Sequence, residues 1–292
     1  MFGKLIEQMN NQGPTFIIIG PGRTGSTSLY EYFRGINEIQ LAKNIKETNF
    51  FNFNYDKGID WYLNFYSSND PKPIRGEISN MYIYNPSVAK RIYDHFPDVN
   101  IISILRNPYD RLISMYNYKI QKGELDPKIN IQEAINFDRS LVERNYYGTL
   151  LEPFYNYFEP SNIYVTTYDL LKENAPLFLN KILSFIGVSI FDINNQDLTT
   201  HNPSKVLRNT ILSGVIRSSA NTLRKLRLYY MLDRLKRSKK VNSLLFKESG
   251  VETRLSQTTV EELKISINPE IKKAETLTGL DLSSWCNGPT NQ

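Results

Sequence analysis

The chain has 292 residues, of which 40% are hydrophobic and 12% aromatic, and its formal net charge at pH 7 is +5. This composition supports a sizeable core and excludes a disordered chain, so we predict a single domain over residues 1–292. No apolar run approaches the roughly 20 residues of a membrane-spanning helix, and residues 1–10 are too polar for a secretory signal. The single cysteine, Cys286, cannot form an intramolecular disulfide, and we expect a cytoplasmic protein.

The first predicted elements are a buried strand at Phe16–Ile19, a glycine-rich turn and a helix over Ser26–Arg34. From Gly20 onward the turn fits the GxxxxGK[ST] pattern of nucleotide-phosphate loops, except that Ser26 stands where lysine is required. Its glycines let the backbone approach an anion, and the amides at the helix start converge on it. The sequence thus predicts an anion-binding loop whose nearest cation is Arg23.

Strands and helices are predicted to alternate along the rest of the chain. The segments are helix 86–96, strand 100–105, helices 109–119 and 144–158, strand 163–167, and helices 175–186 and 258–278. We assign no element to the runs 38–42 and 75–82. The alternation predicts an α/β fold, in which a central parallel β-sheet is flanked by helices and carries the phosphate-binding loop after its first strand.

The strand predicted at 100–105 ends in Arg106, and the helix that follows carries Ser114. Ligands of open parallel sheets bind at such strand ends. A phosphate-loop kinase usually has an aspartate there to hold Mg²⁺, whereas an arginine repels the metal and binds a phosphate directly. We therefore predict a second anion site and no metal. Arg111 is either another phosphate contact or the partner of Asp110 in a structural ion pair.

Most of the positive charge lies in residues 217–240, which hold nine Lys/Arg and one Asp, a local charge of +8 that leaves about −3 elsewhere. Apolar residues recur there at helical spacing, so we predict a basic helical insertion at about 210–255. One interpretation is a solvated helical face. Another is a surface for an acidic acceptor or for peripheral contact with an anionic membrane. No nucleic-acid-binding module is recognisable, and we predict no nucleic-acid partner.

Four motifs follow one another in the order of a known family. They are R-x-G-[ST]-[ST] at 23–27, K-E-x-x-F-F at 46–51, G-E-x-S at 76–79 and L-R-N-P-x-D-R-x-x-S-x-Y at 105–116. In this order they resemble sulfotransferases that use 3′-phosphoadenylyl sulfate (PAPS), and the likeness covers most of the chain except 210–255. The first and fourth motifs together are specific. The resemblance implies the sulfotransferase fold, PAPS as donor, adenosine 3′,5′-bisphosphate as product, and no required metal.

The resemblance also assigns a donor site to the residues that match. It implies that Arg106 and Ser114 bind the 3′-phosphate, that Tyr168 contacts the adenine side, and that Lys205 and Arg208 close over the donor. The loop residues that would hold the 5′-phosphosulfate are Gly22, Arg23, Thr24, Gly25, Ser26, Thr27 and Ser28. The alternatives are a core role for Tyr168 and a plain solvated loop around Lys205.

An acceptor hydroxyl or amine must lose a proton when it attacks sulfur, so a general base is needed. Resemblance to carbohydrate-directed members assigns this role to Glu47, whose alternative is a surface pair with a neighbouring lysine. Lys46 and Glu77 are expected to contact the acceptor, and Glu77 is the second candidate for the base. Relatives often have lysine where Ile78 stands, which is a departure. Arg23, a fixed cation, would stabilise the charge on the leaving phosphate.

The sequence therefore predicts a sulfotransferase that moves the sulfuryl group of PAPS to a hydroxyl or amine of a carbohydrate, a glycolipid or another small molecule. Two alternatives remain open. A phosphate-loop nucleotide kinase would bind ATP with Mg²⁺, which Ser26 and Arg106 both oppose. A catalytically inactive nucleotide-binding scaffold would bind the donor without any role for Glu47.

Overall fold

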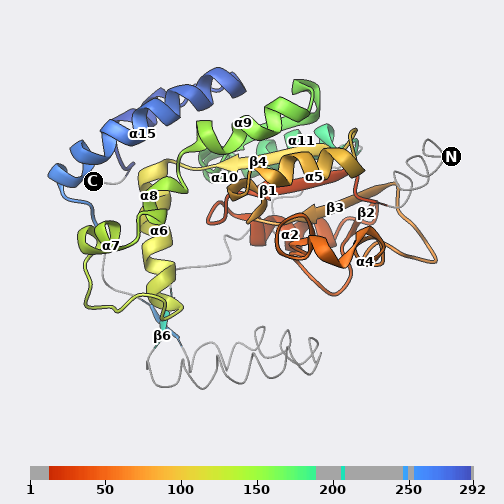
Figure 1. Cartoon of the computed structure of the whole chain (residues 1–292), viewed down its shortest axis with the longest axis horizontal. Helices are drawn as coiled ribbons and strands as arrows, with labels where there is room; N and C mark the ends of the chain where they lie inside the picture. The colour runs from red at the N-terminus through yellow and green to blue at the C-terminus, as the bar shows by residue number, and fades with distance from the viewer. Residues whose placement is uncertain (1–12, 189–204, 208–245, 249–252, 291–292) are drawn as a thin grey trace.

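The computed structural model describes residues 13–188, 205–207, 246–248 and 253–290 (Figure 1). The basic segment 217–240 and Arg208 lie outside the described residues. Five parallel strands form a sheet of order β2-β3-β1-β4-β5, so the predicted α/β architecture is confirmed. The strands are β1 (Phe16–Gly20), β2 (Ile39–Leu41), β3 (Ile74–Ile78), β4 (Asn100–Leu105) and β5 (Ile163–Thr167).

The central strand β1 is buried on both faces, which explains its unbroken apolar run. Alternate residues of a strand point to opposite faces. Phe16 and Ile18 pack into one core cluster, and Ile17 and Ile19 pack into the other. Each of these fully buried side chains contributes about 1.5–3 kcal/mol relative to an exposed position. The sequence of β1 thus requires a helical layer on each side of the sheet.

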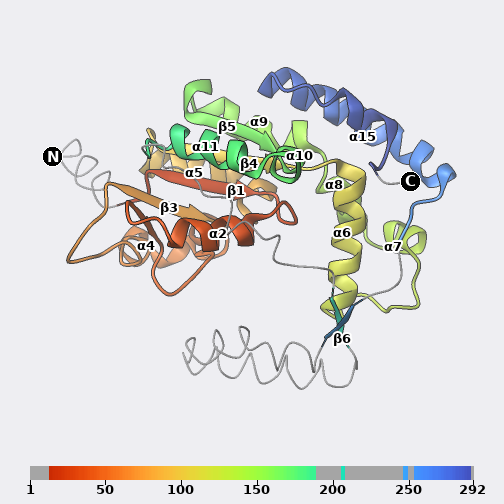
Figure 2. The ribbon, with the colours of Figure 1, turned by 180° about the vertical axis from the view of Figure 1, so that it is seen from behind.

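The two helical layers differ in thickness. Figure 2 shows α2 (Ser26–Arg34) and α11 (Ala175–Phe185) on the side of Phe16 and Ile18. The other side is covered by α3 (Phe50–Phe53), α4 (Ile59–Leu63), α5 (Ser87–His95) and α9 (Tyr147–Tyr157). A long helix, α15 (Gln257–Thr278), packs on α9 as an outer layer (Figure 1).

The remaining elements connect these layers. They are α6 (Pro108–Gln121), α7 (Ile131–Phe137), α8 (Ser140–Glu143), α10 (Tyr168–Glu173), the 3₁₀ turns η1 (Tyr55–Lys57), η2 (Tyr82–Tyr84), η3 (Pro160–Asn162) and η4 (Ser283–Asn287), and an antiparallel ribbon of β6 (Lys205–Leu207) and β7 (Phe246–Glu248). No helix in the described ranges is both long and apolar enough to cross a membrane.

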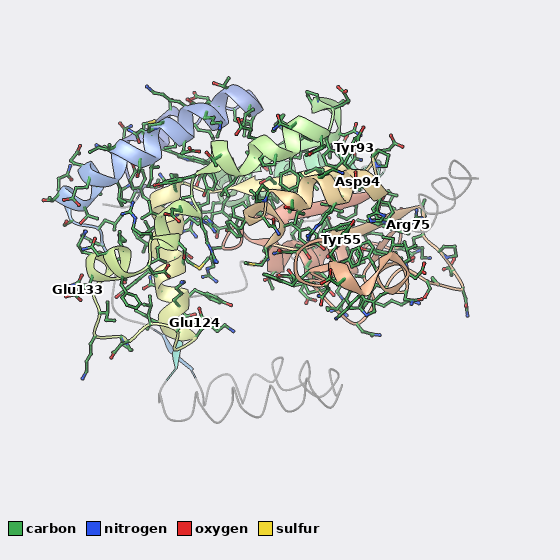
Figure 3. All side chains as sticks on the ribbon, viewed as in Figure 1. Tyr55, Arg75, Tyr93, Asp94, Glu124 and Glu133 are labelled. Carbon is green, nitrogen blue, oxygen red and sulfur yellow. The ribbon has the colours of Figure 1, made fainter. Side chains whose placement is uncertain are left out.

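Two strands were missed by the sequence analysis. β2 is a three-residue edge strand, and β3 carries the charged residues Arg75 and Glu77 in a fully buried segment. Arg75, labelled in Figure 3, satisfies part of its hydrogen-bonding capacity by donating from Nε to the carbonyl oxygen of Gly13 at 2.6 Å. Charged residues mask a strand in sequence when their partners come from distant segments, because the apolar pattern is interrupted.

The strand order brings the carboxyl ends of the parallel strands to one edge of the sheet. The chain leaves β1 toward β3 and β2 on one side, and β4 and β5 lie on the other, so the order reverses beside β1. Ligands of open α/β sheets bind at this reversal point. The loop after β1, Asn80 after β3, Arg106 after β4 and Tyr168 after β5 all follow these strand ends.

Candidate functional site

The loop after β1 has the geometry of an anion-binding turn. It leads into the first turn of α2, where backbone amides and the helix dipole favour a negative ligand. Gly25 has a φ of 84°, and a Cβ there would lie 2.7 Å from Leu171 Cδ2, so the position requires glycine. The Thr24 hydroxyl is buried and donates to the carbonyl oxygen of Pro21 at 2.8 Å. The Thr24 side chain therefore stabilises the loop conformation. Only the Thr24 backbone is left for the predicted contact with PAPS.

The Arg23 side chain contacts α6. Its φ of 74° lies in the left-handed region, which is uncommon for a residue with a side chain. Nε donates to Ser114 Oγ at 3.0 Å, and the guanidinium lies over the Tyr118 ring, 4.9 Å from its centroid. Burial lowers the pKa of Arg23, and Tyr118 opposes that effect. Arg23 and Ser114, two residues predicted to bind PAPS, are thus in direct contact.

Arg106 completes this cationic cluster from the end of β4. Nη1 donates to the carbonyl oxygen of Arg23 at 3.3 Å, and the guanidinium lies 4.9 Å from the centroid of the Tyr168 ring. Its Nε is buried and has no hydrogen-bond partner among the described residues. A buried charged donor of this kind is satisfied by an anion. The structure therefore brings Arg23, Arg106, Ser114 and Tyr168 together.

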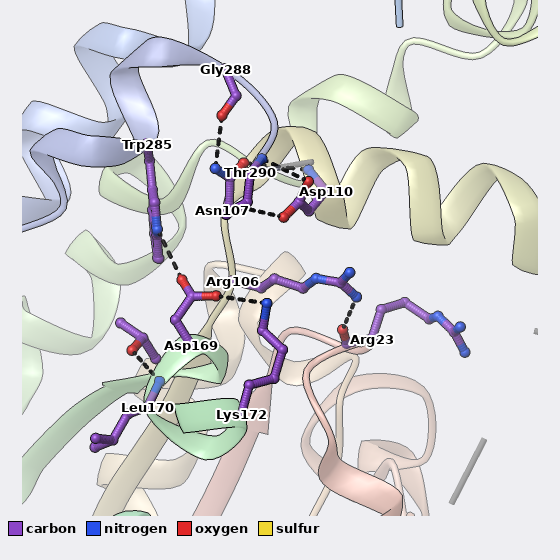
Figure 4. A network of polar contacts seen from close by, with 11 residues as sticks. Arg23, Arg106, Asn107, Asp110, Asp169, Leu170, Lys172, Trp285, Gly288 and Thr290 are labelled. Atoms are coloured by element: carbon purple, nitrogen blue, oxygen red, sulfur yellow. Dashed lines mark hydrogen bonds and ion pairs between the residues drawn. The ribbon is translucent and has the colours of Figure 1, made fainter. Parts of the chain in front are cut away.

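The turns that carry Arg106 and Tyr168 are fixed by the C-terminal segment, which the sequence analysis missed (Figure 4). Asn107 caps α6 and donates from Nδ2 to the carbonyl oxygen of Gly288 at 2.8 Å. Trp285 donates from Nε1 to Asp169 Oδ2 at 3.1 Å. These bonds join one terminal segment to the residues immediately after Arg106 and Tyr168. No local pattern predicts them, since their partners are more than a hundred residues apart.

Arg111 has neither of the two roles left open by the sequence. It is fully buried and donates from Nε to the carbonyl oxygen of Gly22 at 2.9 Å. Nη1 donates to Asn145 Oδ1 at 2.7 Å and to the carbonyl oxygen of Arg144 at 2.9 Å. Asp110 instead accepts two bonds from Thr290. Arg111 therefore supports the anion-binding loop from beneath, as a buried cation surrounded by oxygen acceptors.

Glu47 and Lys46 lie beside the anion-binding loop. Lys46 Nζ donates to Thr27 Oγ1 at 2.9 Å and is 3.9 Å from Glu47 Oε1. Burial lowers the pKa of Lys46, and the carboxylates of Glu47 and Glu31 oppose this effect. Glu47 Oε1 accepts a hydrogen bond of 2.8 Å from Asn80 Nδ2. The Glu47 carboxylate and the Lys46 amine therefore lie together at the start of α2, next to the place where the loop would hold an anion.

Glu77 is buried in the core, and our expectation that it contacts the acceptor or serves as base is contradicted by its surroundings. Its side chain is 1% exposed, and its oxygens accept hydrogen bonds from four hydroxyl groups and one backbone amide. The donors are the hydroxyls of Thr48, Tyr62, Ser79 and Tyr82 and the amide of Thr48. Burial raises the pKa of Glu77, and the hydroxyl bonds oppose that effect. Glu77 anchors the residues next to Glu47 to β3.

Two other predicted contacts cannot be placed. Lys205 begins β6, whose side chains are not described, and Arg208 lies outside the described residues. Within the described part of the chain, no cluster of three or more His, Cys, Asp or Glu side chains has an arrangement that could hold a metal ion. The charged groups described above at these strand ends include the cations Arg23, Arg106 and Lys46 and the carboxylate of Glu47.

Comparison with known proteins finds similarity in sequence and in fold. A family model described as a sulfotransferase domain matches residues 14–225. The bifunctional heparan sulfate N-deacetylase/N-sulfotransferase 4 of Mus musculus is 28% identical over 222 residues, 69% of this chain and 25% of that protein. The type 1 enzyme of the same species is 31% identical over 205 residues, 63% of this chain and 23% of that protein. The chain thus spans about a quarter of the length of these relatives.

The fold likeness extends over more of the chain. The crystal structure of a sulfotransferase from Alicyclobacillus acidocaldarius superposes with a TM-score of 0.64 at 18% identity, covering 93% of this chain and 98% of that one. At this identity the match shows that the two chains share a fold.

Proposed function

Because the chain belongs to the sulfotransferase domain family, we propose that it transfers a sulfuryl group from PAPS to a hydroxyl or amine of a carbohydrate acceptor. The observation that supports this donor best is the unpartnered, buried Nε of Arg106. Arg106 Nη1 donates to the carbonyl oxygen of Arg23 in the glycine-rich loop, and this loop can hold a second anionic group. PAPS has two such groups, a 3′-phosphate and a 5′-phosphosulfate, so one ligand satisfies both sites.

In this proposal the two ends of the donor have separate sets of contacts. The amides at the start of α2, with the hydroxyls of Ser26, Thr27 and Ser28, hold the phosphosulfate. Arg106 and Ser114 hold the 3′-phosphate through charge-assisted hydrogen bonds. Tyr168, over which Arg106 lies, contacts the adenine side. When bound, PAPS supplies a sulfuryl group already activated by its link to phosphate.

The transfer step requires a base on the acceptor side and a cation on the leaving-group side. The acceptor oxygen or nitrogen forms a bond to sulfur while the bond from sulfur to the 5′-phosphate oxygen breaks. Glu47 takes the proton of the acceptor, and adenosine 3′,5′-bisphosphate leaves. Arg23 stabilises the charge that develops on the phosphate, and its planar cation does so without giving up a proton.

A carbohydrate acceptor is supported by the relatives, which are named as heparan sulfate N-sulfotransferases. The acceptor group can be an amine or a hydroxyl, because Glu47 can take a proton from either. A glycolipid is a further candidate, because the net charge of residues 217–240 would attract an anionic surface. We also retain the proposal of a cytoplasmic location.

Titration calorimetry separates this proposal from the kinase alternative. Adenosine 3′,5′-bisphosphate and ATP are titrated into the protein, each with and without Mg²⁺. We expect the bisphosphate to bind without Mg²⁺ and more tightly than ATP. Preferential, Mg²⁺-dependent binding of ATP would overturn the proposal in favour of a kinase.

A further inference from the structure

Asn80 lies between the candidate base and the anion-binding loop. It follows β3 and precedes η2, and Nδ2 donates to Glu47 Oε1 at 2.8 Å. Its backbone carbonyl oxygen is 2.5 Å from where a Cβ on Gly20 would stand, and its own Cβ is 3.6 Å from the corresponding point at Gly22. Because Gly20 and Gly22 lack side chains, Asn80 lies directly against the loop. Its side-chain amide connects the loop to Glu47.

The contact leaves one oxygen of Glu47 available as a proton acceptor. Asn80 bonds to Oε1, and Lys46 lies 3.9 Å from the same atom. Among the described residues no hydrogen-bond donor engages Oε2. A hydrogen bond at one carboxylate oxygen fixes the plane of the group and thus the direction of the other oxygen's lone pairs. The donor is a neutral amide, which orients the carboxylate without adding a full positive charge beside it.

The oxygen of the Asn80 side-chain amide is in an unfavourable environment. Its Oδ1 is buried and has no hydrogen-bond partner in the described part of the chain. An unsatisfied buried acceptor destabilises a fold. Exchanging the amide ends would present oxygen to the Glu47 carboxylate, so the observed orientation is required by Glu47. A buried polar group left in this state calls for a specific explanation, and the hydrogen bond to Glu47 provides one.

From these contacts we propose that Asn80 is a positioning residue that holds Glu47 at the loop with Oε2 directed to the acceptor. This inference rests on the proposed function for its role in transfer, while the Asn80–Glu47 contact is testable without any turnover. Sequence gave no sign of it, because Asn80 follows the G-E-x-S motif and carries no charge.

The kinetic test combines three variants in a cycle. Asn80→Ala removes the donor, Glu47→Gln removes the base, and the third variant carries both changes. Transfer of ³⁵S from PAPS to N-desulfated heparan oligosaccharide is measured, with release of sulfate to water as a readout that needs no saccharide. A hydrogen bond to a charged group supports an expected fall in kcat of about 10- to 100-fold for Asn80→Ala. In the Glu47→Gln background the same change should have almost no further effect, since a residue acting through Glu47 loses its role there.

Asn85→Ala is the matched control. Asn85 lies at the end of η2 and donates from Nδ2 to Asn52 Oδ1 at 2.9 Å, without contact to Glu47. It should retain the kcat of the unmodified protein. Should Asn80→Ala fail to fold, Asn80→Leu keeps the approximate side-chain shape while removing the donor without adding a charge, and it carries the same expectation. Equal losses from Asn80→Ala in both backgrounds would overturn the proposal, as would an unchanged kcat.

A spectroscopic readout separates this inference from the proposed function. In a ¹H–¹⁵N spectrum the Asn80 side-chain amide is assigned by its loss in Asn80→Asp. We expect this resonance to shift in Glu47→Gln, whereas the Asn85 side-chain amide should not. An unmoved Asn80 resonance would overturn the inference even if transfer occurs. A shifted resonance in a protein that transfers no sulfuryl group from PAPS would refute the proposed function and leave the contact established.

Discussion

Arg23 Nε donates to Ser114 Oγ at 3.0 Å, joining the anion-binding loop to the middle of α6 across 91 positions of sequence. The two residues are proposed to bind different ends of the donor. Because Arg23 and Ser114 are in direct contact, the proposed 5′-phosphosulfate and 3′-phosphate sites are adjacent.

Replacement of Ser114 by alanine should weaken binding of adenosine 3′,5′-bisphosphate. The hydroxyl is proposed to donate to the 3′-phosphate, and losing one hydrogen bond to a charged group supports a decrease in affinity of about tenfold or more. Calorimetry measures this directly. Ser140 begins α8 and is not among the residues proposed to bind PAPS, so Ser140→Ala provides the control. An affinity unchanged in Ser114→Ala would remove Ser114 from the donor site.

Arg23→Lys and Arg23→Met test whether the charge of Arg23 is sufficient for its role at the leaving group. Arg23→Met removes the cation, and loss of a preorganised group of this kind lowers kcat by about 10²–10³-fold. Arg23→Lys keeps the charge and should retain most of the rate, although it loses the planar contact with Tyr118. Rates of ³⁵S transfer at saturating PAPS measure both. If lysine is as slow as methionine, charge alone does not explain the role of Arg23.

Lys46→Met should make the protein more stable and less active. Burial lowers the pKa of Lys46, so the folded state loses stability as pH falls through that lowered value and is already penalised at neutral pH. Removing the amine relieves this penalty and should raise the melting temperature. It also removes a cation from the loop, so transfer should slow. Lys43→Met, an exposed change three residues earlier, should alter neither property. A lower melting temperature for Lys46→Met would contradict this electrostatic argument.

The pH dependence of unfolding should show the effect of His95. Its Nε2 lies 3.0 Å from the Tyr55 hydroxyl (Tyr55 is labelled in Figure 3), and burial lowers the pKa of His95 while Asp94 opposes that effect. The unfolded chain then takes up a proton near pH 6.5 before the folded chain does. Stability should therefore decline as pH falls below about 6.5. His95→Gln should flatten this decline in urea titrations, and an unchanged slope would show that other groups cause it.

The central architecture could be predicted because buried parallel strands have a simple signature. β1 and β5 are rich in apolar and β-branched residues, as is β4 apart from Asn100 and Ser103, and α2 and α6 begin within one residue of their predicted starts. β3 could not be found in this way. Its Glu77 is satisfied by hydroxyls of Thr48, Tyr62 and Tyr82, which only the fold brings together.

The same distinction applies to the candidate site. Arg106 and Ser114 stand in one contiguous motif, and the loop around Arg23 in another, so their types and spacing predicted an anion site. The roles of Arg111 and Asn80 depend on Gly22 and Glu47, which reach them from other segments. Sequence alone does not specify such contacts, because no local pattern relates the partners. The predicted lid residues Lys205 and Arg208 and the basic segment 217–240 stay predictions.

Glu47→Gln tests the central claim most directly, because it keeps the shape of the side chain and removes its ability to take a proton. The ³⁵S transferred from PAPS to N-desulfated heparan oligosaccharide is compared for the unmodified protein and the variant, alongside calorimetry with adenosine 3′,5′-bisphosphate. General base catalysis contributes about 10²–10⁴-fold, so we predict a loss of that order with bisphosphate affinity unchanged. Full transfer by Glu47→Gln would contradict the role of Glu47 as base. No transfer by the unmodified protein to any saccharide or lipid, with bisphosphate still bound, would contradict the proposed acceptor class.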